Sequence, residues 1–330
     1  MEEKIDILLA TYNGEKYLKE QIESILNQTH KNIKIIISDD CSKDGTTKIL
    51  EEYAKKDGRI EIYIQKENIG VVKNIEFLLK KVEAPYYMLA DQDDYWMPEK
   101  VEKTLKTLKE KKADLAFGDL EVVDENLETM YPSFNDYMLL TRKINKYINN
   151  YKINYLYNCI TGCTLLAKKE TIKYILPLPT KSKHLIHDYW MGIMVAINGK
   201  LAYTSEKLIK YRQHGNNQVG TNKISHGFKK LEQVRNWFIE VKLGIFETYV
   251  ENNERFPEEI KKLNIEALNY YKMIQNKKCF NFRKWNIFHE LYKTETFIYY
   301  IENFLIMNLP CIAKILFKIR YLFLKVIGKR

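Results

Sequence analysis

The sequence predicts an α/β protein with a Rossmann-like, mostly parallel central sheet flanked by helices, followed by a helical C-terminal extension. Two observations carry this prediction. Over residues 5–89, short apolar runs alternate with segments whose apolar residues recur at helical spacing, and beyond residue 223 the chain reads as almost wholly helical. Parallel strands need crossover connections, so this alternation favours a parallel sheet with helices on both faces.

The individual elements follow from the same periodicities. Four strands are expected early in the chain, at residues 5–9, 33–37, 60–64 and 86–89. The helix after the first strand is marked by Leu18, Ile22, Ile25 and Leu26. Further along we expect a strand at 115–118, a turn at 122–126, a turn of small residues leading into a strand at 161–167, and a helix from His187 to Ala196.

Length, composition and charge restrict the class of protein. The 330 residues are 45% hydrophobic, enough for a large core, and the net charge of +10 favours an anionic partner such as a nucleotide diphosphate, a membrane surface or a nucleic acid. Biased codon usage explains the lysines equally well. The five cysteines form no CxxC pair, which argues against a disulfide framework or a zinc ribbon and fits a reducing cytosol. The start MEEKIDILLATYN has acidic residues where a signal peptide needs basic ones, so we expect no secretion.

Polar residues follow three of the expected strands. They are Thr11 to Gly14, Asp39-Asp40 and Asp91 to Asp94. Ligands of parallel sheets bind beyond the carboxyl ends of the strands, so these three groups should converge on one edge.

The stretch YMLADQDDYW crowds three carboxylates into four residues. An acidic surface turn is the ordinary interpretation, but close carboxylates raise one another's pKa unless a cation or several donors stabilise them. Hard oxygen ligands suit Mg²⁺, Mn²⁺ or Ca²⁺. An EF-hand is excluded, because Trp96 stands where that loop requires glycine.

Six segments together resemble the family 2 glycosyltransferases, nucleotide-sugar-dependent enzymes of the GT-A fold, and especially bacterial rhamnosyl- or polysaccharide-side-chain transferases. They occur in family order over the first two-thirds of the chain: LLATYNGEKYLKEQIESILNQT, IIISDDCSKDGT, NIGVVKN, ADQDDYWMPEK, HDYW and YRQHGNN. The resemblance implies a catalytic domain at 1–222, with a nucleotide-binding half at 1–95 and an acceptor half at 96–222, before a helical region at 223–330.

The resemblance also implies residue roles at the donor site. The nucleotide would be bound by Thr11, Tyr12, Asn13, Asp40, Lys73, Asp91 and Gln92. Asp40 would accept a hydrogen bond from the base and Tyr12 would stack on it, whereas an Asx turn is the ordinary interpretation of Asp39-Asp40. Lys73 could reach a phosphate, although a plain helix start explains it as well.

By the same resemblance, Asp91-Gln92-Asp93 is the DxD motif, which holds Mn²⁺ or Mg²⁺ against the diphosphate. Asp93 is the expected direct ligand, with Asp91 acting through the ribose or a metal-bound water and Asp94 orienting the segment. His214 could add a nitrogen ligand, or its segment could close over the diphosphate. Asp188 in HDYW would be the catalytic base, and an N-cap is its structural alternative.

The function implied is inverting, metal-dependent transfer of sugar from a UDP- or dTDP-sugar to a hydroxyl of a glycan acceptor, lipid-linked or free, in cell-surface polysaccharide or capsule assembly. A sugar nucleotidylyltransferase and a basic nucleic-acid-binding protein are the alternatives, the latter disfavoured because its motifs are missing. Residues 303–330 place lysines and apolar residues on separate helix stripes. That pattern suits either a membrane interface or packing on the chain's own domain, and we expect a cytoplasmic enzyme peripheral to the inner face of the plasma membrane.

Overall fold

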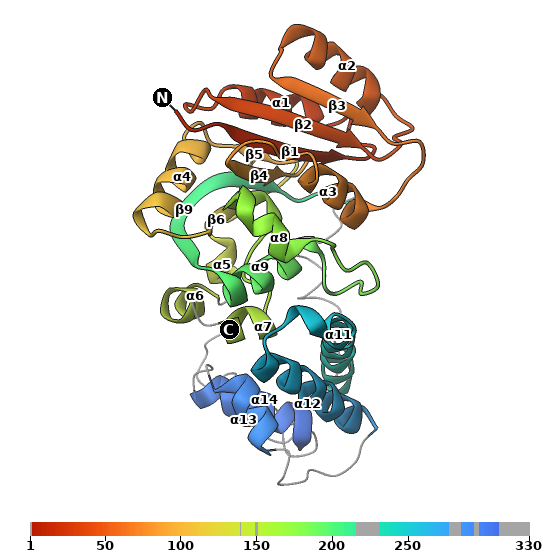
Figure 1. Cartoon of the computed structure of the whole chain (residues 1–330), viewed down its shortest axis with the longest axis vertical. Helices are drawn as coiled ribbons and strands as arrows, with labels where there is room; N and C mark the ends of the chain where they lie inside the picture. Colours follow the sequence, from red (N-terminus) through yellow and green to blue (C-terminus); the bar gives the residue numbers. More distant parts are fainter. Residues whose placement is uncertain are drawn as a thin grey trace, which may run out of the picture. The chain divides into compact units, whose positions relative to one another are not determined.

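The computed structural model describes residues 2–138, 140–148, 151–215, 231–276, 285–293 and 297–309 (Figure 1). The chain divides into two compact units, one made of Met1–Thr180 with Ile186–Val219 and the other of Lys181–Leu185 with Gly220–Arg330. The boundary expected at residue 222 lies outside the described residues, as do residues 310–330 of the expected C-terminal amphipathic helix.

A single twisted sheet forms the centre of the first unit. Within the described residues it contains nine strands in the order β3-β2-β1-β4-β8-β6-β9-β5, with β7 paired to β6. The strands are β1 Ile5–Thr11, β2 Ile33–Asp39, β3 Ile60–Ile64, β4 Tyr86–Ala90, β5 Tyr95–Trp96, β6 Leu115–Val123, β7 Thr129–Tyr131, β8 Leu166–Lys168 and β9 Leu201–Arg212. The pairs among β1 to β4 and the pair β6-β9 are parallel, which confirms the predicted α/β fold.

Helices and short 3-10 turns connect these strands. They are α1 Leu18–Leu26, α2 Thr46–Lys56, α3 Val71–Leu79, α4 Lys100–Glu110, α5 Phe134–Tyr137, α6 Thr141–Tyr147, α7 Tyr151–Leu156, η1 Gly162–Thr164, η2 Lys169–Thr171, α8 Ile172–Ile175 and α9 His187–Asn198. The first four strands and the helix beginning at His187 were all predicted from periodicity.

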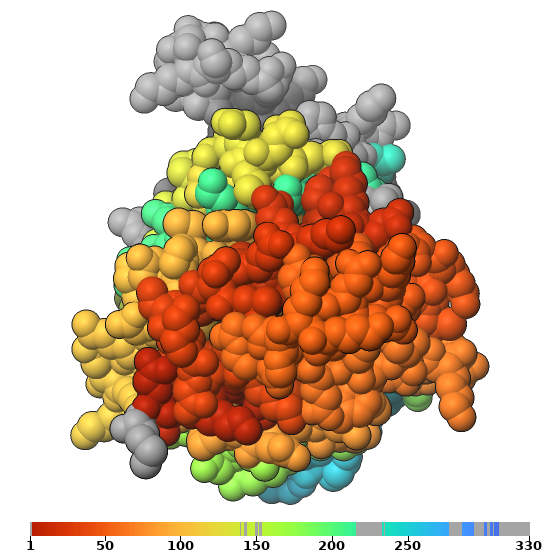
Figure 2. Space-filling model, turned by 90° about the horizontal axis from the view of Figure 1, so that it is seen from above, coloured from red at the N-terminus to blue at the C-terminus, as the bar shows by residue number. Residues whose placement is uncertain are grey.

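Both faces of β1 are buried, as expected for a parallel sheet. Ile5, Ile7 and Leu9 belong to a core cluster that also contains apolar residues of α1, α2 and α4. Leu8 points to the opposite face and is equally buried, on the side where α3 packs against β1 and β2. Residues from the first part of the chain, red to orange, form most of the face seen in Figure 2.

One local prediction is wrong. The turn expected at 122–126 begins two residues later, because Val122 and Val123 pair with β9 and extend β6. The turn itself spans Asp124 to Leu127, with an N–H of Leu127 donating to the Asp124 carbonyl and Leu127 in the left-handed region. The longer strand brings Glu125 next to Arg212, a contact that matters for the site.

The second unit is helical in its described part. It contains α11 Leu231–Glu251, η3 Asn253–Arg255, α12 Glu258–Gln275, α13 Trp285–Tyr292 and α14 Phe297–Asn308. The buried Arg235 donates to the carbonyls of Ile274 and Met307, at the ends of two helices, where carbonyls lack helical partners. Among the described residues, no helix combines the length and apolarity needed to cross a membrane.

Candidate active site

The polar groups after β1, β2 and β4 meet at one edge of the sheet, as predicted. The parallel register pairs Thr11 with Asp39, the last residues of β1 and β2, and Leu9 with Ala90, the last residue of β4. The β4 strand thus ends two residues short of the other two, at the same edge of the sheet. The Thr11 hydroxyl donates to Asp39 Oδ1 at 2.9 Å. The first two loops are therefore joined at their base by a buried hydrogen bond.

Asp39 and Asp40 both stabilise loops. Asp39 accepts hydrogen bonds from the backbone N–H and the hydroxyl of Ser42, at 2.8 and 2.6 Å, which is the Asx turn considered above. Asp40 accepts the N–H groups of Ile69 (2.7 Å) and Gly70 (2.9 Å). Gly70 has φ +82°, a conformation that favours glycine, so Asp40 fixes the entry to α3. The base contact expected of Asp40 stays a prediction.

Asn13 and Tyr12 differ in how they are held. The N–H of Asn13 donates to the Ser42 hydroxyl, and its side-chain oxygen accepts the N–H of Lys43, both at 2.8 Å. Asn13 thereby connects the β1 loop to the β2 loop through two hydrogen bonds. The Tyr12 side chain is 45% exposed, which leaves its ring face available to a ligand. Lys73 is exposed in the first turn of α3, and its phosphate contact stays a prediction.

Asp93 meets His214, although 121 positions separate them. His214 Nε2 lies 2.8 Å from Asp93 Oδ2, and both side chains are largely buried. The His214 ring also lies against the Tyr17 ring, with centroids 4.9 Å apart. Asp93, the expected direct metal ligand, and His214, the possible nitrogen ligand, are thus brought together.

The other two carboxylates of the loop lie close to Cys163, Asp91 partly buried and Asp94 fully buried. Burial, together with the charges of Asp93 and Asp188, raises the pKa of Asp91 to about 7. Asp94 is fully buried, and burial with the charges of Asp93 and Asp91 raises its pKa well above the usual value. Asp94 accepts the Arg212 N–H at 3.3 Å through Oδ1, while its Oδ2 has no hydrogen-bond partner among the described residues.

Lys100 is a buried lysine near this loop that no sequence pattern indicated. Its Nζ lies 3.3 Å from the centre of the Trp96 ring and has no hydrogen-bond partner in the described part of the chain. Burial lowers the pKa of Lys100 to about 7, while the nearby Cys163, Asp94 and Asp91 act in the opposite direction. The cluster of Asp91, Asp94 and Cys163, whose ligand atoms lie within 4.8 Å of one another, therefore has the amine of a buried lysine near it.

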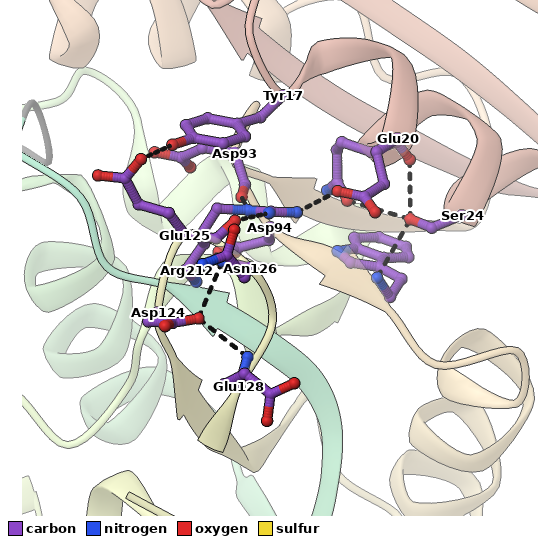
Figure 3. A network of polar contacts seen from close by, with 12 residues as sticks. Tyr17, Glu20, Ser24, Asp93, Asp94, Asp124, Glu125, Asn126, Glu128 and Arg212 are labelled. Carbon is purple, nitrogen blue, oxygen red and sulfur yellow. Dashed lines mark hydrogen bonds and ion pairs between the residues drawn. The ribbon is translucent and has the colours of Figure 1, made fainter. Parts of the chain in front are cut away.

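Arg212 joins four segments around Asp93 (Figure 3). Its guanidinium donates to the carbonyls of Asp93 (2.9 Å) and Glu125 (2.6 Å) and to the Glu20 carboxylate of α1. Its side chain is buried and lies 4.5 Å from the centre of the Tyr17 ring. Arg212 occurs in the YRQHGNN segment, but no local pattern predicts its partners.

Asp188 lies in the first turn of α9, where Ile186 holds the N-cap position without a side-chain cap. Its carboxylate accepts the N–H of Gly162 (3.1 Å), the Asn158 amide (3.0 Å) and the N–H of Tyr189 (2.6 Å). Burial raises the pKa of Asp188, and its charge in turn raises the pKa of Asp91. The charge of Asp188 therefore acts on the carboxylate loop that follows β4. Asp188 is not the N-cap residue of α9, because Ile186 holds that position.

Two tryptophans near these motifs belong to the core, and a histidine adjoins Asp188. Trp96 and Trp190 are fully buried, and Trp190 donates to the carbonyl of Ile175. Burial lowers the pKa of His187, which favours a neutral imidazole beside Asp188.

The residues present fit a divalent cation. Asp93 and His214 supply an oxygen and a nitrogen ligand at one point. Asp91, whose ligand atom lies within 4.8 Å of those of Asp94 and Cys163, adds a carboxylate whose pKa is raised by burial and by the charges of Asp93 and Asp188. A cation next to these groups would lower their electrostatic cost. Asp93, His214 and Asp91 are the residues that would hold it.

Comparison with known proteins identifies the family. The family model described as "Glycosyl transferase family 2" matches residues 6–175, which contain the Thr11, Asp40 and DxD segments. The chain is a family 2 glycosyltransferase. This confirms the resemblance and decides against the nucleotidylyltransferase alternative.

Relatives of this glycosyltransferase extend the match. It is 30% identical to the dTDP-rhamnosyl transferase RfbG of Shigella flexneri over 244 residues, 70% of this chain and 80% of that protein. Its fold resembles the crystal structure of S. aureus TarS 1-349 in complex with UDP-GlcNAc, with a TM-score of 0.55 at 19% identity, over 88% of this chain and 81% of the other. It also resembles the mannosyltransferase PcManGT from Pyrobaculum calidifontis in complex with GDP-Man and Mn²⁺, with a TM-score of 0.53 at 13% identity, over 82% of this chain and 70% of the other.

Proposed function

We propose that this glycosyltransferase transfers a sugar from a UDP- or dTDP-sugar to a hydroxyl of a glycan acceptor, with inversion and with Mn²⁺ or Mg²⁺ bound at Asp91, Asp93 and His214. The observation that carries the proposal is the convergence of Asp93 and His214 at 2.8 Å on the sheet edge where the β1 and β2 loops meet. Donor classes named for the relatives, a dTDP-sugar and UDP-GlcNAc, support the choice of nucleotide.

Each residue has a separate task in the proposed reaction. Thr11, Tyr12, Asn13 and Asp40 form the turns that would receive the nucleoside, with the exposed ring of Tyr12 available for stacking on the base. The cation, when bound, would offset the negative charge that grows on the departing diphosphate. Lys73, exposed at the start of α3, would add a positive charge for a phosphate.

Asp188 would take the proton of the attacking hydroxyl. The raised pKa of its carboxylate makes it a stronger base than an exposed aspartate, and its three hydrogen-bond donors hold the carboxylate in one orientation. In-line attack opposite the diphosphate inverts the anomeric carbon, and it requires the base and the leaving group on opposite sides of the sugar.

The acceptor is proposed to be a growing cell-surface glycan, capsular or otherwise, carried on a lipid at the inner face of the plasma membrane. The resemblance to polysaccharide-side-chain transferases and the net charge of +10 support this proposal. Residues 303–330 would provide the membrane contact.

A panel of nucleotide sugars, incubated with Mn²⁺, Mg²⁺ or EDTA and without acceptor, tests the donor and the metal together. Slow hydrolysis should release free UDP or dTDP only when a divalent cation is present. The stereochemistry of transfer follows from NMR of the product's anomeric proton. Release of pyrophosphate, or equal turnover in EDTA, would contradict the proposal.

A further inference from the structure

Gln92, the middle residue of the DxD motif, pairs with the backbone of Tyr12. Its Oε1 accepts the Tyr12 N–H at 2.8 Å, and its Nε2 donates to the Tyr12 carbonyl at 3.0 Å. Both polar atoms of the amide are thus used on one residue that lies 80 positions away. These two hydrogen bonds have the same pattern as the two that opposite residues of neighbouring antiparallel strands make with each other.

Gly14 provides the space for this pair. A Cβ at position 14 would lie 2.3 Å from Gln92 Oε1 and 2.5 Å from Gln92 Cδ, and its three nearest heavy atoms all belong to Gln92. Among the described glycines, Gly70 has a positive φ and Gly14 does not, so backbone conformation does not require glycine at 14. What requires it is the close approach of the Gln92 side chain.

The pair joins the two halves of the donor site. The backbone of Tyr12 belongs to the turn after β1, and Gln92 stands between the carboxylates of Asp91 and Asp93. The next residue, Asn13, is itself bonded to the β2 loop through Ser42. Hydrogen bonds therefore connect the carboxylate loop, the Tyr12 backbone and the β2 loop in series.

We propose that Gln92 is a positioning residue that couples the nucleotide turn to the metal-binding carboxylates, and that Gly14 is glycine because it must admit the Gln92 amide. This inference rests on the proposed function, since it assigns the two loops to nucleotide and metal. In this proposal Gln92 does not bind the donor directly, as the resemblance implied. It acts on donor binding through the Tyr12 backbone.

The decisive experiment is a double-mutant cycle of Gln92→Ala and Gly14→Ala, with UDP or dTDP affinity measured in the presence of Mn²⁺. Each single variant should weaken nucleotide binding about 10-fold, since each removes two hydrogen bonds. The double variant should be no weaker than Gln92→Ala, because a Cβ at position 14 has nothing left to displace. Multiplied effects in the double variant, or wild-type affinity in Gln92→Ala, would overturn the proposal.

Gln65→Met is the matched control, because Gln65 is also half-buried after a strand and its amide donates to the Ser38 hydroxyl at 3.0 Å. It should keep wild-type nucleotide affinity. A merely structural role for Gln92 would lower the melting temperature and leave nucleotide affinity unchanged, so both are measured for every variant.

Amide hydrogen exchange separates this inference from the proposed function. Mn²⁺ added without nucleotide should slow exchange at Tyr12 and Asn13 in the wild-type protein and leave it unchanged in Gln92→Ala. That result would uphold the coupling even if no donor in the panel were consumed. Equal exchange with and without Mn²⁺ in the wild-type protein would refute the coupling whatever the donor.

Discussion

His214 Nε2 and Asp93 Oδ2 lie 2.8 Å apart. The residues that directly follow β9 therefore place an imidazole beside the carboxylate loop after β4. If this pair forms part of a metal site, His214→Ala should weaken Mn²⁺ binding by at least about 10-fold, because one ligand is lost. Mn²⁺ electron paramagnetic resonance titration measures this directly. His30→Ala is the control, since the His30 ring, just before β2, lies 2.7 Å from the Glu3 carbonyl, and its loss should leave the Mn²⁺ affinity unchanged.

Replacement of Asp188 tests the catalytic base. Asp188→Asn should reduce transfer by about 10² to 10⁴-fold while nucleotide affinity stays near that of the wild-type protein, because a neutral amide cannot accept the proton. Steady-state kinetics and nucleotide titration give the two quantities. Asp114→Asn, which alters a half-buried aspartate bonded to Lys168 and Lys200, should retain activity. Near-normal turnover of the Asp188 variant would reject its role as base.

The crowding of the carboxylates after β4 should make the stability of the folded protein depend on pH. Asp91 has a pKa of about 7 in the folded chain and an ordinary value when unfolded, so its contribution to stability is full at low pH and is lost as the pH rises through about 7. His184 and His187 have lowered pKa values and act oppositely in this range, so a single variant must be compared with wild type.

Asp91→Asn isolates that contribution. In EDTA, the wild-type protein should lose stability relative to Asp91→Asn as the pH rises from about 5 to about 8. Each kcal/mol lost from its free energy of unfolding should lower its melting temperature by about 2–4 °C. Mn²⁺ should raise the wild-type melting temperature more at pH 8 than at pH 5, because the carboxylates bind it in their ionised form. A pH-independent difference between the two proteins would contradict this account of Asp91.

Lysine at position 212 should not support the stability and metal affinity that Arg212 provides. A single ammonium cannot reach the Asp93 carbonyl, the Glu125 carbonyl and the Glu20 carboxylate together, so Arg212→Lys should lower the free energy of unfolding by about 1–3 kcal/mol and weaken Mn²⁺ binding. Urea denaturation and Mn²⁺ titration measure the two effects. Arg59→Lys is the control, because Arg59 is one-third exposed and its carboxylate partner, Asp57, lies in the same turn.

The sequence alone determined the first half of the sheet. Ile5, Ile7 and Leu9 alternate with residues of the other face, and Leu18, Ile22 and Ile25 recur on one side of a helix. These signals are local, since they follow from the geometry of a strand or a helix and from apolar burial. The edge on which Thr11, Asp39 and Asp91 gather follows from the same rule, because parallel strands end together.

Only the tertiary structure decided which side chains meet at that edge. Arg212 with Glu20, Asp93 with His214 and Gln92 with Tyr12 are pairs separated by 80 to 192 positions. Nothing in the local spacing of these residues predicts such partners, because each contact depends on how β9 and the loop after β4 are placed by the whole sheet. The sequence therefore determined which chemical groups reach the site, and the register of distant strands decided which of them act together.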